Sequence, residues 1–296
     1  CSFVSLRAQT GIGGVLNQAD IQLNFRSTNG VFSNAGITPA INGSSVEQWN
    51  DQSGNGFHLS QNIALNRPTY ITGAINGFPA IRFDGISSYM LRNFTPGSIT
   101  NYSLLLIGSF SNVTQPVNDF DIAVTLGNNV NNTLTFGRTS SNFSPPNSYY
   151  AFKSSGGQLR SGNTITSGFN IFTQVIRSSA PFHGYFSDGQ EVAVSDFSSA
   201  PVLAKRINVG RSLIAAYPHY FNGDLLELVL VTNNYNSTQN IILQNHYAAK
   251  YRLNLASDKF SFEATHGNEV AGIGQETLSD NHTDAQGSAI VRINGA

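Results

Sequence analysis

The runs YSLLLIGSF at residues 102–110 and GDLLELVLV at residues 223–231 decide the fold class of this chain. Both runs are almost continuously apolar, whereas a strand with one face in water alternates apolar and polar side chains. A strand of the continuous kind is covered on both of its faces. We therefore predict that the two runs are central strands of a sheet with protein packed on either side.

Shorter strand-like runs surround these two and are separated by clusters of Asn, Ser, Gly and Pro. They lie at residues 19–25, 78–85, 121–127, 132–138, 169–177 and 206–212. Many short strands cut by turn clusters are typical of antiparallel sandwiches. The fold class that we predict is all-β, a two-sheet antiparallel β-sandwich.

One segment has the periodicity of a helix. Residues 236–253 place apolar side chains at intervals of three and four, and Asn236 and Gln239 have the spacing of an N-cap and its reciprocal partner. Lys250 and Arg252 suit the C-terminal end of such a helix. We expect this helix to cover an edge or end of the sheet.

Composition excludes several classes of function. The 296 residues are 40% hydrophobic but only 11% charged, with 16 basic and 17 acidic side chains spread thinly. Nucleic acid is therefore not an expected partner, because no basic stripe is present. No apolar window is long enough for a membrane span. The single cysteine, Cys1, leaves no disulfide within the chain and no thiolate cluster for zinc or iron.

Changes in residue composition along the chain suggest that it has three parts. Residues 1–9 read as the remnant of a signal peptide, with an ordinary first strand as the alternative, residues 10–255 as the sandwich, and residues 256–296 as the start of a truncated second β domain. The last part has too few large apolar side chains for a core of its own. With a leader, the protein would be secreted or attached to the cell surface.

The loop in VEQWNDQSGNGFHLSQ at residues 46–61 suggests calcium at first sight. Asp51, Ser53, Asn55 and Gly56 fill four positions of an EF-hand loop, but its twelfth position, which needs a bidentate Glu, is Asn62. Asp, Ser, Asn and Gly, including Gly54, are equally the residues of Asx turns. We predict a structural turn and no cofactor, with a weaker calcium site as the alternative, and expect Trp49 to anchor the corner in the core.

Three motifs in order carry a resemblance to a known family. WNDQSGNG at 49–56, RPTY at 67–70 and NGFPAIRFDG at 76–85 are followed near the end by FNGDLLEL at 221–228 and AAKYRL at 248–253. The chain resembles the laminin-G-like, concanavalin A-like jelly-roll modules of bacterial secreted proteins, and EVAGIGQE at 269–276 is similar to the opening of a β domain that often follows them. The resemblance implies a jelly roll that binds carbohydrate or protein within a multidomain chain.

Most motif residues read as framework. Phe83, Asp84 and Gly85 end a strand and turn, and Gly223 opens the last strand. Glu227 lies inside an apolar run, where a carboxylate needs a partner. We interpret Glu227 as a structural pair, with a functional acid as the alternative.

Candidate ligand-binding residues are aromatic, because sugars stack on exposed rings. Two loops qualify, SPPNSYYAFK at 144–153 with Tyr149 and Tyr150, and AAYPHYFNGD at 215–224 with Tyr217 and His219. Rings that only cap the core are the alternative. The predicted function is a non-catalytic module that binds a glycan or a surface protein.

Two other classes of function stay open. The first is a structural spacer in an adhesin, which would have no exposed aromatic cluster. The second is a glycoside hydrolase, which needs two facing carboxyl groups. The only acids two residues apart are Asp119 and Asp121, and no third acid follows in the spacing of the laminarinase pattern.

Overall fold

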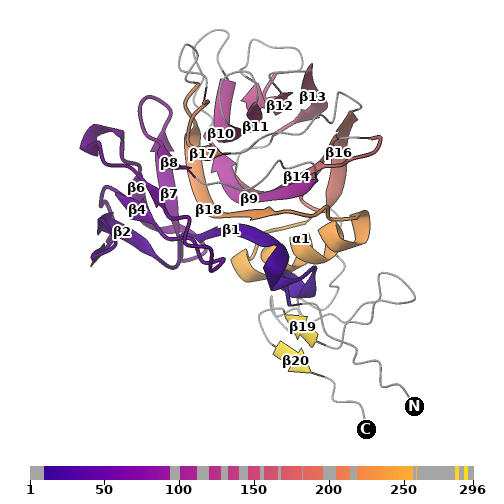
Figure 1. The fold of residues 1–296 in the computed structure, drawn as a ribbon, viewed down its shortest axis with the longest axis horizontal. Helices are drawn as coiled ribbons and strands as arrows, with labels where there is room; N and C mark the ends of the chain where they lie inside the picture. Colours follow the sequence, from indigo (N-terminus) through magenta and orange to yellow (C-terminus); the bar gives the residue numbers. More distant parts are fainter. Residues whose placement is uncertain are drawn as a thin grey trace.

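The computed structural model describes residues 10–93, 101–111, 120–127, 133–139, 146–153, 157–165, 168–181, 183–195, 205–213, 219–255, 258, 284–286 and 290–292. These residues form two large antiparallel sheets, a separate two-stranded sheet and one α-helix (Figure 1). The predicted fold class, an all-β sandwich, is confirmed. The predicted signal remnant at 1–9 and most of the predicted second domain at 256–296 lie outside the described residues.

The first sheet holds the two runs that decided the fold. Its order is β16 (Gln190–Ser195), β15 (His183–Ser187), β14 (Gly168–Ile176), β9 (Tyr102–Phe110), β18 (Asn222–Val231), β7 (Phe78–Asp84) and β6 (Thr69–Ile75). β18 pairs with β7 through its first residues, and further along with β1 (Ile21–Arg26). The long strand β18 therefore lies between β9 on one side and the strands β7 and β1 on the other.

The second sheet faces the first across the core. Its order is β13 (Gly157–Thr164), β12 (Ser148–Lys153), β11 (Thr133–Thr139), β10 (Phe120–Gly127), β17 (Arg206–Val209), β8 (Met90–Asn93), β5 (Leu59–Ser60), β4 (Gln48–Trp49), β2 (Val31–Asn34) and β3 (Thr38–Pro39). Short 3-10 turns lie at Ile12–Gly14, Gln18–Asp20 and Ala64–Asn66. β19 (Asp284–Gln286) and β20 (Ile290–Arg292) form a separate two-stranded antiparallel sheet.

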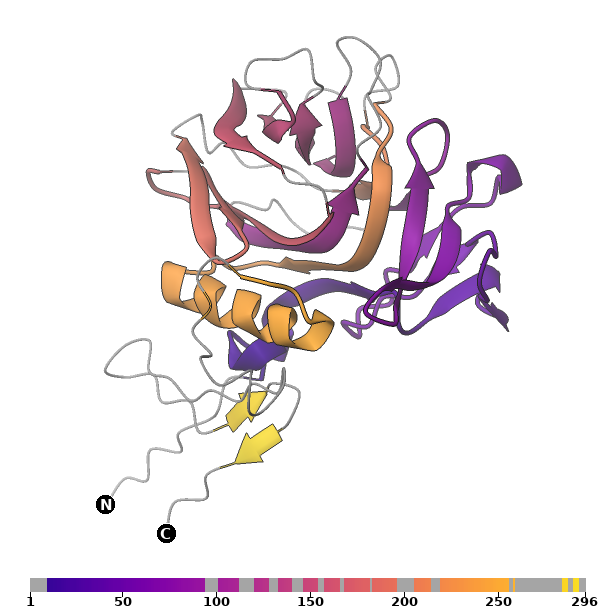
Figure 2. The same ribbon diagram turned by 180° about the vertical axis from the view of Figure 1, so that it is seen from behind.

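Both faces of the central strands are covered, as the sequence predicts. Leu104 and Leu106 of β9 point into the main core between the sheets, whereas Leu105 and Ile107 point into a second apolar cluster. That second cluster is covered by the helix α1 (Ser237–Tyr251), which lies across the outer side of β18 and β9 (Figure 2). The helix therefore covers the face of the central strands, whereas an edge or end of the sheet was expected. Side chains that alternate along β9 are therefore buried in two different apolar clusters, one on each face of the sheet.

The helix begins where the sequence places it. The Asn236 side chain accepts a bond of 2.8 Å from the Gln239 backbone N–H, and the Gln239 side chain accepts one of 3.0 Å from the Asn236 N–H. Arg252 ends the helix in the left-handed conformation, with φ of 55°. No helix among the described residues is long and apolar enough to cross a membrane.

Two predicted strands are shorter than their apolar pattern. The strand predicted at 19–25 begins at Ile21, because Asn17 and Asp20 close a capping box over a 3-10 turn. The strand predicted at 206–212 ends at Val209, since Gly210 has φ of 93° and a Cβ there would lie 2.4 Å from the Phe83 ring. Gly210 therefore changes the direction of the chain just before Arg211.

Candidate functional site

The loop that resembles a calcium site is closed by its own hydrogen bonds. Asp51 is 7% exposed, and its Oδ1 accepts from the backbone N–H groups of Asn24 and Ser53, both at 2.9 Å. Its Oδ2 accepts from the Ser53 hydroxyl at 2.7 Å and the Phe57 N–H at 3.1 Å. These donors hold both carboxylate oxygens, as the predicted structural turn requires.

Trp49 anchors the same corner. Its side chain is fully buried, packs on Phe25 with ring centroids 5.4 Å apart, and donates from Nε1 to the Arg26 carbonyl at 2.9 Å. The prediction that Trp49 fixes this corner in the core is confirmed.

Asp84 organises the turn after β7. Its Oδ1 accepts from the backbone N–H groups of Ile86, Ser87 and Ser88 and from the Ser88 hydroxyl, at 2.8 to 2.9 Å. Burial by itself raises the pKa of Asp84, but these hydrogen bonds outweigh burial and hold the pKa well below its usual value. Asp84 is framework, as predicted.

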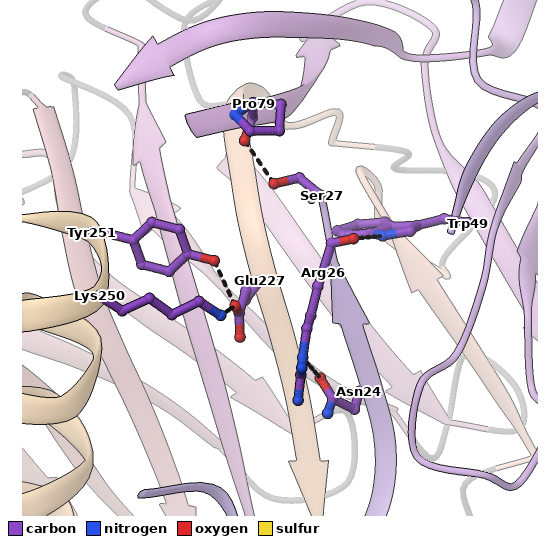
Figure 3. Close-up of polar contacts among 8 residues, drawn as sticks. All are labelled: Asn24, Arg26, Ser27, Trp49, Pro79, Glu227, Lys250 and Tyr251. Carbon is purple, nitrogen blue, oxygen red and sulfur yellow. Dashed lines mark hydrogen bonds and ion pairs between the residues drawn. The ribbon is translucent and has the colours of Figure 1, made fainter. Parts of the chain in front are cut away.

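Glu227 has partners from the helix. Its side chain is 1% exposed, and one oxygen forms an ion pair with Lys250 and accepts from the Tyr251 hydroxyl (Figure 3). Arg26 is the cross-strand neighbour of Glu227 and turns its guanidinium toward Asn24, 3.3 Å away. Burial first, and then the charge of Glu227, raises the pKa of Tyr251, so this hydroxyl remains a donor. The interpretation of Glu227 as a structural pair is supported.

Two further acids are tied to arginines across strands. Asp121 and Arg138 form an ion pair with side chains 1% and 6% exposed, and Asp121 Oδ1 also accepts from the Asn222 N–H at 2.7 Å. Asp224 holds Arg82 in a bidentate pair with both distances 2.8 Å. Asp121 therefore connects the two sheets, while Asp119 lies outside the described residues.

Of the four predicted ligand-binding residues, the structure describes the side chains of Tyr149 and His219. Tyr149 is 4% exposed and lies within 5.6 Å of the Phe172 ring and 6.1 Å of the Tyr185 ring, measured between centroids. The prediction that Tyr149 offers its ring to a ligand is wrong, because the ring faces the core. The backbone of Tyr150 belongs to β12, and Tyr217 lies outside the described residues. His219 is half-buried and makes an edge contact with Phe120, with centroids 5.1 Å apart.

A different polar cluster lies on the outer face of the second sheet. It consists of Tyr89, Arg206, Asn208 and Arg211, which we call the arginine face. Ile207 and Val209 point into the main core, so Arg206 and Asn208 point the opposite way. Arg206 Nε donates to Asn208 Oδ1 at 3.0 Å, and the Arg211 guanidinium lies 3.6 Å from the centroid of the Tyr89 ring.

The arginine face could not be predicted from the alternation of side chains along a strand. Arg206 and Arg211 are five residues apart and would fall on opposite faces of a regular strand. The turn at Gly210 breaks that alternation and brings Arg211 to the side of Arg206. The sequence signal that could have revealed the cluster is this glycine between two arginines.

Comparison with known proteins supports the fold. No protein-family model and no curated protein matches the sequence. Domain 4 of AbnA, a GH43 extracellular arabinanase from Geobacillus stearothermophilus solved in complex with arabinotriose, has a TM-score of 0.50 at 13% identity, over 76% of this chain and 98% of that one.

Two other solved structures give similar values. Botulinum neurotoxin type C, whose cell entry is dependent upon interaction with two ganglioside molecules, has a TM-score of 0.51 at 9% identity, over 77% of this chain and 51% of that one. Trypanosoma rangeli sialidase has a TM-score of 0.51 at 11% identity over 81% of this chain, which spans 35% of the sialidase. The similarity shows a shared β-sandwich fold, and these neighbours include carbohydrate-binding domains.

Proposed function

We propose that the chain is a non-catalytic carbohydrate-binding module of a secreted or cell-surface bacterial protein, of the laminin-G-like kind that its motifs resemble. The observation that carries the proposal is the arginine face, where two half-buried guanidinium groups gather on the side of the second sheet that points away from the main core. Sugar hydroxyls and carboxylates are acceptors for such donors. Carbohydrate-binding domains among the structural neighbours support the same class of ligand.

The roles of the buried acids favour binding over catalysis. Asp51, Asp84, Asp121, Asp224 and Glu227 are each held by backbone, hydroxyl or cationic donors. A glycosidase needs one carboxyl group that can donate a proton and a second one facing it across the substrate. These five acids serve the framework of the sandwich instead.

A glycan array tests the proposal. The 296-residue chain is applied to neutral and acidic glycans with calcium and again with EDTA, and its folding is checked by the fluorescence of buried Trp49. We expect specific binding in both buffers, because donors on Asp51 occupy the oxygens that calcium would need. Folded protein that binds no glycan would favour the spacer, and release of shortened glycans would favour the hydrolase.

A further inference from the structure

Among the described strands, none places an acid opposite Arg206 of the arginine face. Arg82 pairs in register with Asp224, Arg138 with Asp121 and Arg26 with Glu227. The cross-strand partners of Arg206, in contrast, are Gly127 on β10 and Asn93 on β8. Arg206 and Arg211 form no ion pair within the described part of the chain, where the pairs are Arg67–Glu47, Arg82–Asp224, Arg138–Asp121, Arg177–Glu191 and Lys250–Glu227.

The two arginines are also close enough to repel each other. Burial lowers the pKa of Arg206, and the charge of Arg211 lowers it further. Both side chains are half-buried, so water screens them only in part. Two like charges held side by side lose their repulsion when an anion lies between them.

Within the described ranges, two donors of the cluster have no acceptor. Asn208 is fully buried, and neither its Nδ2 nor the buried Nε of Arg211 has a hydrogen-bond partner among the described residues. Buried donors of this kind are costly unless they find an acceptor. An anion seated at the arginine face would supply acceptor oxygens as well as negative charge.

The framework fixes the position of these donors. The Tyr89 ring supports the Arg211 guanidinium at 3.6 Å, and Thr125 Oγ1 donates to the Arg211 carbonyl at 3.3 Å. Arg211 also forms a backbone bridge with Tyr220. The Arg206 guanidinium is positioned by its hydrogen bond to Asn208 Oδ1. Donors that are held in place before binding lose less conformational entropy than mobile ones.

We propose, on the premise that the chain binds glycans, that Arg206 and Arg211 bind the carboxylate of an acidic sugar. A planar guanidinium matches a carboxylate in a bidentate pair. A cluster of two arginines in a chain of net charge -1 suits one small anionic group better than a polyanion. Inorganic phosphate shares this chemistry and is separated from the sugar by the test.

The test measures affinity by calorimetry for the full 296-residue chain. The probes are 3′-sialyllactose and trigalacturonic acid as acidic glycans, lactose as the neutral counterpart of the first, and inorganic phosphate. We expect an acidic glycan to bind more tightly than lactose and phosphate. Arg206→Gln and Arg211→Gln should each weaken that binding about ten- to a hundredfold, the loss of a charge-assisted pair. Arg211→Lys keeps the charge without the planar fork and should lie between.

Arg92→Gln is the matched control. Arg92 lies on β8 next to β17, and its buried Nε has no partner among the residues that the structure describes. It pairs in register with the core residue Ile207, so its side chain lies on the face of the sheet opposite to the arginine face. Its removal lowers the positive charge of the same strand pair without touching the arginine face. We expect the affinity for the acidic glycan to be unchanged in this variant.

The remaining outcomes test the acidic-sugar site and the glycan-binding function that it rests on. Binding of lactose or other neutral glycans that the arginine variants leave unchanged would overturn this inference and retain the glycan-binding function. Phosphate binding as tight as that of the acidic glycans would overturn the assignment to a sugar. Equal losses in Arg92→Gln and Arg206→Gln would also contradict it, because net charge would then explain the binding. Absence of any glycan binding by folded protein would overturn both.

Discussion

Replacing Lys250 by Met should destabilise the protein strongly, because it leaves a carboxylate buried without its cation. The Glu227 side chain is 1% exposed, and one of its oxygens contacts Lys250 and the Tyr251 hydroxyl. The other oxygen has no hydrogen-bond partner in the part of the chain that the structure describes. Breaking a buried ion pair by removing one partner costs about 3–5 kcal/mol. Lys250 itself is 28% exposed, so part of this interaction is already screened by water.

With that discount, we expect Lys250→Met to lower the free energy of unfolding by about 2–4 kcal/mol. The assay is equilibrium unfolding in urea followed by the fluorescence of Trp49, which is the only tryptophan and is fully buried when folded. Lys205→Met is the control, since Lys205 is exposed, and it should change stability by no more than about 0.5 kcal/mol.

The double variant Glu227→Gln with Lys250→Met tests the physical cause. The amide keeps the size of Glu227 and an acceptor for the Tyr251 hydroxyl, but it buries no charge. The double variant should therefore be more stable than Lys250→Met alone by at least about 1 kcal/mol. A loss below about 1 kcal/mol in Lys250→Met, or no recovery in the double variant, would refute the reasoning.

Three further predictions concern the framework. Arg138→Met leaves Asp121 buried between the sheets and should cost about 3–5 kcal/mol in urea unfolding, so a change under about 1 kcal/mol would contradict the role of this pair. The pKa of Asp84 is lower when folded than when unfolded, so its contribution is complete above about pH 4 and is lost as the pH falls toward the folded pKa. In Asp84→Asn, the free energy of unfolding in urea should fall less steeply between about pH 5 and pH 2 than in the wild type. The same dependence on pH in both proteins would rule out the contribution of Asp84. Gly223→Ala places a Cβ 2.0 Å from the Ser109 carbonyl and should cost about 1–3 kcal/mol, whereas wild-type stability would show that β18 can move away from β9.

The framework could be predicted because it depends on local rules. The runs at 102–110 and 223–231 became β9 and β18 with both faces covered, since their composition allows little else. The helix begins at its predicted cap because Asn236 and Gln239 are only three residues apart. The turn at Asp51 likewise follows from donors within six residues and from one neighbouring strand.

The candidate site depends on distant contacts and could not be predicted in the same way. A Tyr pair in a strand places one ring inward and one outward, and the sequence does not say which. Only the packing of the two sheets shows that Tyr149 meets Phe172 and Tyr185. Only the turn at Gly210 shows that Arg211 lies over Tyr89. Exposed aromatic rings were therefore expected where the structure buries one.

Strand register separates structural arginines from those available to a ligand. Arg82 and Arg138 lie opposite acids that are 142 and 17 residues away in the sequence, so each charge is neutralised within the sheet. Arg206 lies opposite Gly127 and Asn93, and no described residue of the two neighbouring strands forms an ion pair with it. Arg138 is neutralised in the buried interior and Arg206 is not, so variants of Arg138 should change stability, and variants of Arg206 should change anion affinity. A loss of stability in Arg206→Gln as large as that in Arg138→Met would mean that this arginine also serves the framework.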